Sequence, residues 1–242
     1  MMTGFLASLS AVPPPGWDTG LLRDIWINLI HADRYMMLLR GLGLTLQIAA
    51  AGITIGIILG FIIAMMRLSR FPVLRTISRV YVSIIRGIPM LVQLLIWTFV
   101  IFASPGFPKL IICFIAFGVN SGAYVSEIFR AGILSVDRGQ TEAGRSVGLS
   151  SSKTMRLIVF PQAFKNALPP LVNEFIILFK DTSIVGFIGV QDMTRMANVI
   201  LTRTFNAFIP LLTAALLYLI VVIILTWLMG KLERRLRVSD KR

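Results

Sequence analysis

Histidine and cysteine are nearly missing from this 242-residue sequence, which holds one of each. The single cysteine, Cys113, excludes a disulfide within the chain. The single histidine, His31, lies outside the apolar runs, which excludes a metal site of several histidines and a Ser/His/Asp catalytic set. A G-x-x-x-x-G-K-S/T phosphate-binding loop is also absent. We therefore predict no metal, no cofactor and no catalytic residues on this chain.

Charged side chains are scarce as well. They make up 14% of the chain, against about a quarter in soluble domains, and hydrophobic residues make up 56%. Residues 41–66, 87–108 and 204–230 contain no charged side chain, and each run reaches the roughly 20 residues that cross a bilayer. The sequence therefore predicts an integral membrane protein that is entirely helical.

Acidic residues are outnumbered by basic ones, 11 against 24, which gives a formal net charge of +13. In a soluble chain this excess would suggest nucleic acid as a partner. Here the basic residues gather beside apolar runs, at 67–86, 130–165 and 231–242, whereas the connections 103–109 and 190–206 carry only Lys109, Arg195 and Arg203. Cytoplasmic loops are enriched in Lys and Arg. We therefore expect the C-terminus in the cytoplasm and the N-terminus outside, and no binding of nucleic acid.

Five membrane spans fit this charge pattern, at about 36–66, 90–103, 109–133, 164–190 and 206–229. The segment 1–35 precedes them, and apolar residues between Leu22 and Ile30 are spaced to form a short interfacial helix, with a flexible leader as the alternative. The apolar piece 5–12 lacks a basic leader, so we do not expect a cleaved signal peptide. The basic stretch 67–86 predicts an amphipathic helix on the cytoplasmic side, with an apolar face of Leu74, Ile77, Val80 and Ile84. A basic cytoplasmic tail, 231–242, ends the chain.

Three glycines in the first span, Gly52, Gly56 and Gly60, are each four residues apart. They share a smooth helix face that lets a neighbouring backbone approach closely. Packing against another helix of the same chain and a seam between two copies both explain such a face.

The polar stretch 135–161 lies between two apolar ones. A first short helix is predicted to begin near Thr141, whose hydroxyl can cap free N–H groups, and to end at Gly148 in the left-handed conformation. Serines 150–152 can cap a second short helix, and Pro161 is predicted to stop or kink it. The two helices would form a compact knob outside the membrane.

Ionisable groups within the spans are few, and they are costly unless they face a partner or water. Asn173 and Glu174 lie on the fourth span, which Pro169 and Pro170 are predicted to open. A polar route through the bilayer and a set of contacts that locks the bundle both explain these two residues. We favour a structural role for the stretch 180–183 and for Glu127, which is spaced to pair with Arg130.

The polar stretch resembles the EAA loop of bacterial ABC-importer permeases, E-A-A-x3-G-x9-I-x-L-P. Glu142-Ala143-Gly144, Gly148 and Ile158-Val159-Phe160-Pro161 match it, with Gly144 in place of the second alanine and Phe160 in place of leucine. The glycine should weaken its helix by about 1 kcal/mol relative to alanine. Flanking motifs over residues 40–230 narrow the resemblance to the polar amino acid permeases: Arg86-Gly87-Ile88-Pro89, Gly122-Ala123-Tyr124, Leu168-Pro169-Pro170 and Lys180-Asp181-Thr182-Ser183.

This resemblance implies a type I ABC importer membrane domain over 36–230 in the bacterial inner membrane. Glu142, Ala143, Gly144, Gly148 and Pro161, within the loop 135–161, would couple it to separate ATPase subunits that bind ATP and Mg²⁺. A second permease subunit would complete the pathway, and an extracytoplasmic binding protein would deliver a polar amino acid. Asn173 and Glu174 would line the substrate pathway. An ion- or proton-coupled secondary carrier is the alternative, but the internal repeats typical of that class are absent.

Overall fold

The computed structural model describes residues 13, 16, 19–104 and 106–239, with side chains as far as residue 233. The apolar piece 5–12 and the basic side chains from Arg234 onward lie outside the described residues. Helices account for nearly all of the described chain, and no strand occurs in it. The chain divides into two compact units, one formed by residues up to Leu46 with Ser183–Val221, the other by Gln47–Thr182 with residues from Val222 onward.

The first unit begins with the predicted N-terminal helix. Helix α2 (Gly20–Ile25) continues through a π-helical turn, Trp26–Ile30, and a 3₁₀ turn, His31–Asp33. Ala32 and Asp33 have positive φ angles of 57° and 52°, which breaks the helix before α3 (Arg34–Leu68) begins. A short helix therefore precedes α3, as expected, and its place in the membrane interface stays a prediction.

Helix α10 (Met193–Thr204) and the start of α11 (Phe208–Ser239) complete this unit. Its apolar core consists of Leu38, Met193, Met196, Ala197, Ile200 and Ala214. The buried Asp192 caps α10 by accepting hydrogen bonds from the backbone N–H groups of Thr194 (3.0 Å) and Arg195 (3.1 Å). Burial raises the pKa of this carboxyl, and the N–H donors oppose the rise.

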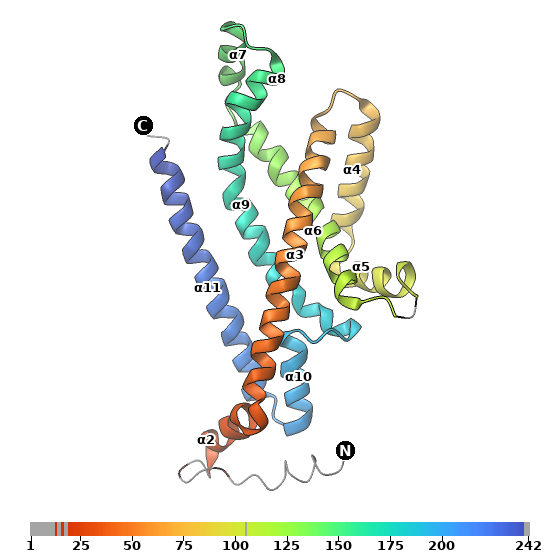
Figure 1. Ribbon diagram of the computed structural model, residues 1–242, viewed down its shortest axis with the longest axis vertical. Coiled ribbons are helices and arrows are strands. Elements are labelled where there is room, and N and C mark those ends of the chain that lie inside the picture. The colour runs from red at the N-terminus through yellow and green to blue at the C-terminus, as the bar shows by residue number, and fades with distance from the viewer. Residues whose placement is uncertain (1–12, 14–15, 17–18, 105, 240–242) are drawn as a thin grey trace. The chain divides into compact units, whose positions relative to one another are not determined.

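The second unit is built around α6 (Lys109–Leu134), which packs against α9 (Phe160–Asp181), α4 (Pro72–Gly87) and α5 (Met90–Ile96) (Figure 1). A π-helical turn, Trp97–Ile101, extends α5. Two short helices, α7 (Arg138–Ser146) and α8 (Ser151–Thr154), lie between α6 and α9, and a π-helical turn, Met155–Val159, leads from α8 into α9. Ala64, Val125, Phe129, Ala167 and Leu171 form a core between α3, α6 and α9.

The glycine stripe of α3 packs against α6 of the same chain. A Cβ atom on Gly56 would lie 2.7 Å from Ser121 Oγ, and one on Gly60 would lie 2.6 Å from Val125 Cγ1. Since real Cβ atoms do not approach other heavy atoms so closely, only glycine permits this helix pair. The stripe is thus an intramolecular packing face.

Helix α4 packs against α6 through a different face from the apolar one that its sequence suggests. Ser78 and Val82 are buried, and the Tyr81 hydroxyl donates to the Val119 carbonyl at 2.6 Å. Ile77, Val80 and Ile84 are exposed instead. The expectation of an amphipathic helix on the cytoplasmic side did not include this contact, because a small serine and a tyrosine with a carbonyl partner contribute little to an apolar pattern.

Three helices in the described chain are long and apolar enough to cross a membrane: Gly20–Leu68, Lys109–Leu134 and Phe208–Glu233. Pro72–Gly87 and Met90–Ile101 make a fourth candidate if they count as one span, bent by 105° at the break before Met90.

The sequence predicts that Pro169 and Pro170 open the fourth span. Helix α9 instead runs through both prolines. Within a helix these prolines remove the hydrogen bonds to the carbonyls four residues earlier, those of Lys165 and Asn166. Asn166 is an exposed residue near the start of the helix.

Candidate functional site

The α7–α8 hairpin, residues 138–154, occupies the polar stretch that the sequence singles out. Gly148 has a φ angle of +85°, and two backbone hydrogen bonds close the turn, from Leu149 N to Gly144 O (3.1 Å) and from Gly148 N to Arg145 O (3.0 Å). This is the Schellman pattern of a glycine-terminated helix. Ser150 Oγ then accepts from Lys153 N and caps α8. The predicted end of the first helix and start of the second are both confirmed.

Two details of the predicted hairpin were wrong. Helix α7 begins at Arg138 instead of near Thr141, because the Asp137 carboxylate accepts from Gly139 N at 2.7 Å and so caps the helix earlier. Pro161 does not stop the second helix, since the helical run continues through it into α9. Pro161 is the second residue of α9 and can donate no N–H hydrogen bond to the π-helical turn Met155–Val159 that precedes it.

Gly144, the departure from the EAA pattern, lies where the two arms of the hairpin meet. It is buried, and a Cβ atom there would lie 2.7 Å from Thr154 Cγ2 and 2.9 Å from Ile158 Cδ1. The lower helix propensity of glycine is therefore accompanied by closer packing of α7 on the second arm. Glu142 and Ala143 are exposed, and Val147 is 76% exposed, so they form the outer surface of the hairpin.

One side-chain hydrogen bond joins the hairpin to α9, and two further contacts join α6 to α9 at the base of the hairpin. Asn166 Nδ2 on α9 donates to Ser135 Oγ at the end of α6 (2.9 Å), and Gln162 Nε2 contacts Gln140 Oε1 on α7 (3.4 Å). A Cβ atom on Gly132 would lie 2.8 Å from the Ala163 carbonyl, so the end of α6 and the start of α9 are in close contact. The hairpin is therefore linked by a side-chain contact to α9, which is itself held against the end of α6.

A cavity of about 370 Å³ lies in the same unit, at the break between α4 and α5. Its walls come from α4, α5, α6 and α9, and carry the charged residues Arg86, Glu174 and Asp181 and the polar residues Asn120 and Tyr124. Gln93 Nε2 donates to the carbonyls of Ile85 and Ile88, both at 2.7 Å, and so holds the end of α4 beside the cavity. Carboxylates and a guanidinium thus face one space of small-molecule size.

Of the two residues predicted to line a pathway, only Glu174 reaches this cavity. Glu174 is 7% exposed, and Ser121 Oγ on α6 donates to its Oε1 at 3.2 Å. Asn173 is exposed on another side of α9, outside the cavity. Its place in a substrate pathway stays a prediction.

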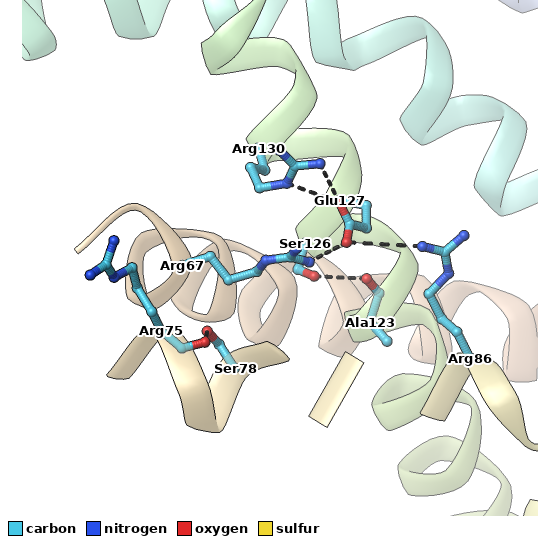
Figure 2. A network of polar contacts seen from close by, with 8 residues as sticks. All are labelled: Arg67, Arg75, Ser78, Arg86, Ala123, Ser126, Glu127 and Arg130. Carbon is cyan, nitrogen blue, oxygen red and sulfur yellow. Dashed lines mark hydrogen bonds and ion pairs between the residues drawn. The ribbon is translucent and has the colours of Figure 1, made fainter. Parts of the chain in front are cut away.

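A second cluster surrounds Glu127 on α6 (Figure 2). Arg130 Nε and Nη2 contact Glu127 Oε2 at 3.0 Å and 2.9 Å, which confirms the predicted pair, and Arg67 at the end of α3 donates to Oε1. Arg86 Nη1 lies 3.9 Å from Oε1 as well. One carboxylate therefore joins α3, α4 and α6 through three guanidinium groups.

Sequence reasoning missed Arg86, Tyr124 and Asp181 as cavity residues. Arg86 was assigned to a basic cytoplasmic face, and Asp181 to a structural role. One signal was available, because Arg86 directly precedes the helix-breaking Gly87-Ile88-Pro89, and a broken helix next to a charged side chain is typical of transporter sites. Tyr124 gave no signal of this kind.

Comparison with known proteins gives consistent results. The family model described as "Binding-protein-dependent transport system inner membrane component" matches residues 52–238. The chain is 40% identical over 211 residues to the arginine transport system permease protein ArtQ of Bacillus subtilis, covering 84% of this chain and 94% of that one. It is 39% identical over 214 residues to the L-cystine transport system permease protein TcyB of the same species, covering 86% and 90%.

Among solved structures, the chain is similar to one described as "Crystal structure of an amino acid ABC transporter with histidines". The TM-score is 0.79 at 38% sequence identity, and the match covers 83% of this chain and 94% of that one. The likeness therefore extends over most of both chains, in sequence and in fold.

Proposed function

Because the chain belongs to the inner membrane components of binding-protein-dependent transport systems, we propose that it forms part of the transmembrane pathway of an ATP-driven amino acid importer. The observation that carries this proposal is the cavity beside Arg86, which offers carboxylates and a guanidinium to one small ligand. A free amino acid brings an ammonium and a carboxylate group, and each needs a partner of opposite charge once water is removed. The arginine and cystine systems to which the similar permeases belong support amino acids as the substrate class. Within the cavity, Glu174 is the proposed partner of the ammonium group.

The proposed topology has five spans with the N-terminus outside and the C-terminus in the cytoplasm. Besides the three apolar helices, the bent pair α4–α5 and the more polar α9 would each count as a span. Glu174 and Asp181 make α9 too polar to be recognised by hydropathy, and a water-accessible cavity is where such residues are tolerated in a membrane. In this topology the basic side chains of the α7–α8 hairpin face the cytoplasm.

The α7–α8 hairpin is proposed as the docking element for the ATPase. Members of this family are not themselves catalytic, so ATP and Mg²⁺ would be bound by a separate subunit. Glu142, Ala143 and Val147 on the exposed surface would enter a groove of that subunit, with Gly144, Gly148 and Pro161 shaping the hairpin behind them. The contact of the hairpin with α9, and that of α9 with the end of α6, support transmission of the ATPase motion to the cavity.

A second permease subunit is proposed to cover the exposed face of α4. Val73, Ile77, Val80 and Ile84 are each more than half exposed and recur at spacings of four, three and four residues. Such spacing forms a continuous apolar seam along one side of a helix, as in helix pairs. An extracytoplasmic binding protein would deliver the amino acid to the completed pathway.

Uptake by reconstituted vesicles tests this function. With the ATPase and the binding protein present, we expect uptake of a labelled amino acid to require ATP on the side of the membrane where the ATPase is bound. Glu174→Gln should lower uptake at least about tenfold while the complex stays assembled, because the ammonium group loses a charged partner. Glu233→Gln, the same change on α11 outside the cavity, serves as the control. Uptake by this chain alone, driven by an ion or proton gradient, would contradict the proposal and favour a secondary carrier.

A further inference from the structure

Arg86 is the only basic residue among the described residues that line the cavity. Glu174 and Asp181 enter from α9, whereas Arg86 enters from the last turn of α4. A carboxylate-bearing ligand whose ammonium group meets Glu174 therefore has one guanidinium within the cavity to receive its negative end.

The ion pair between Arg86 and Glu127 is too long to be a hydrogen bond. The distance of 3.9 Å exceeds the range in which an N–H···O bond forms, and the Arg86 side chain is 45% exposed. Glu127 is meanwhile bound by Arg67 and by both contacts of Arg130. The charge of Glu127 is thus already compensated, and Arg86 keeps its N–H donors for another acceptor.

Tyr124 fixes where those donors lie. The Arg86 guanidinium carbon is 5.1 Å from the centre of the Tyr124 ring, and Tyr124 itself lines the cavity. A guanidinium over an aromatic ring leaves its edge available for a carboxylate, which it can bind through two parallel hydrogen bonds. Figure 2 shows Arg86 reaching toward Glu127 from the side opposite Arg67 and Arg130.

We propose that Arg86 binds the carboxylate of the transported amino acid, and that Tyr124 and Glu127 act as positioning residues that hold its guanidinium at the cavity wall while the cavity is empty. The proposal rests on the proposed importer function and adds the residue that recognises the negative end of the substrate. Entry of the substrate would exchange the loose pair with Glu127 for a bidentate pair with the ligand. Amines that lack the carboxylate would not trigger this exchange.

Binding to the complete transporter in lipid nanodiscs tests the assignment, with two pairs of probes that differ by the carboxylate alone: L-arginine with agmatine, and L-histidine with histamine. In the wild type we expect each amino acid to bind more tightly than its amine. Arg86→Gln should weaken binding of the amino acids about 10- to 100-fold without weakening that of the amines, because the carboxylate contact is lost and a positive charge that repels the amines is removed. The affinity of Arg86→Lys for the amino acids should lie between those of the wild type and Arg86→Gln, since lysine keeps the charge but cannot form two parallel hydrogen bonds. Arg86→Lys also replaces the glutamine variant in the test if that variant fails to fold.

Arg75→Gln is the matched control, because Arg75 is an exposed arginine of the same helix outside the cavity and is expected to leave the preference for the carboxylate unchanged. Suppose that Glu174→Gln weakens binding while Arg86→Gln keeps the wild-type ratio of amino acid to amine. The assignment of Arg86 is then wrong, although the cavity remains the binding site. If neither variant changes binding of any probe, or if the wild type binds none of the four, the cavity is not the amino acid site and the proposed function loses its main support.

Discussion

The three glycines of α3 show how much one missing side chain determines. At Gly56 and Gly60 the backbone of α3 approaches α6 so closely that a methyl group would overlap Ser121 or Val125. The spacing of four residues predicted a smooth face on α3 but not the helix that packs against it. Close packing requires small residues whether the second helix belongs to the same subunit or to another one. The contacts of the folded chain decide between the two.

We predict that Gly60→Ala destabilises the protein by about 1–3 kcal/mol through overpacking. The added methyl group would also lie 2.9 Å from the backbone nitrogen of Ser126, which cannot move aside as a flexible side chain can. Gly43→Ala in the same helix is the control, since nothing lies within 4 Å of its added Cβ and alanine favours the helix by up to about 1 kcal/mol. Thermal unfolding in detergent should therefore show opposite shifts. Equal melting temperatures of Gly60→Ala and Gly43→Ala would mean that α3 and α6 leave room for a methyl group at residue 60.

At the scale of single elements, the caps at Gly148 and Ser150 were predictable, whereas the Asp137 cap and the continuity of the helices were not. Gly148 and Ser150 have strong local signals, a left-handed residue and a side-chain acceptor, and both behave as predicted. Pro161 was predicted to stop or kink its helix, and Pro169 and Pro170 to open the fourth span. The helical run from Ser151 passes through all three prolines. A π-helical turn precedes Pro161, and a turn of this kind cannot be recognised in the sequence alone.

Gly148→Ala should loosen the hairpin without affecting the rest of the fold. A φ angle of +85° costs a residue with a Cβ atom about 1 kcal/mol, so the turn that ends α7 should open about fivefold more often. Hydrogen exchange checks this at the amides of Gly148 and Leu149, which donate to Arg145 O and Gly144 O.

Val147→Ala provides the comparison for this variant, because Val147 is 76% exposed and its replacement keeps the glycine turn intact. We expect its exchange to match the wild type. Unchanged exchange in Gly148→Ala as well would show that the left-handed turn does not limit the stability of the hairpin.

At the scale of the second unit, α9 joins the two candidate functional regions. It begins at Phe160 behind the hairpin and carries Glu174, 14 residues later, into the cavity, a distance of about 20 Å along a helix. Pro169 and Pro170 lie between these points and remove two hydrogen bonds at which the helix can bend. We therefore expect motion of the hairpin to reach the residues proposed to hold the substrate along this helix.

The central claim is that the α7–α8 hairpin couples this chain to an ATPase, and co-purification of the tagged chain from its native membrane tests it most directly. We expect an ATPase with a phosphate-binding loop, verified by mass spectrometry and ATP hydrolysis, to accompany the wild type. Glu142→Lys should release it, because Glu142 is exposed on the docking surface, whereas the matched reversal Glu233→Lys on α11 should retain it. An ATPase that stays bound to the folded Glu142→Lys variant as well as to the wild type, or that accompanies neither, would contradict the account.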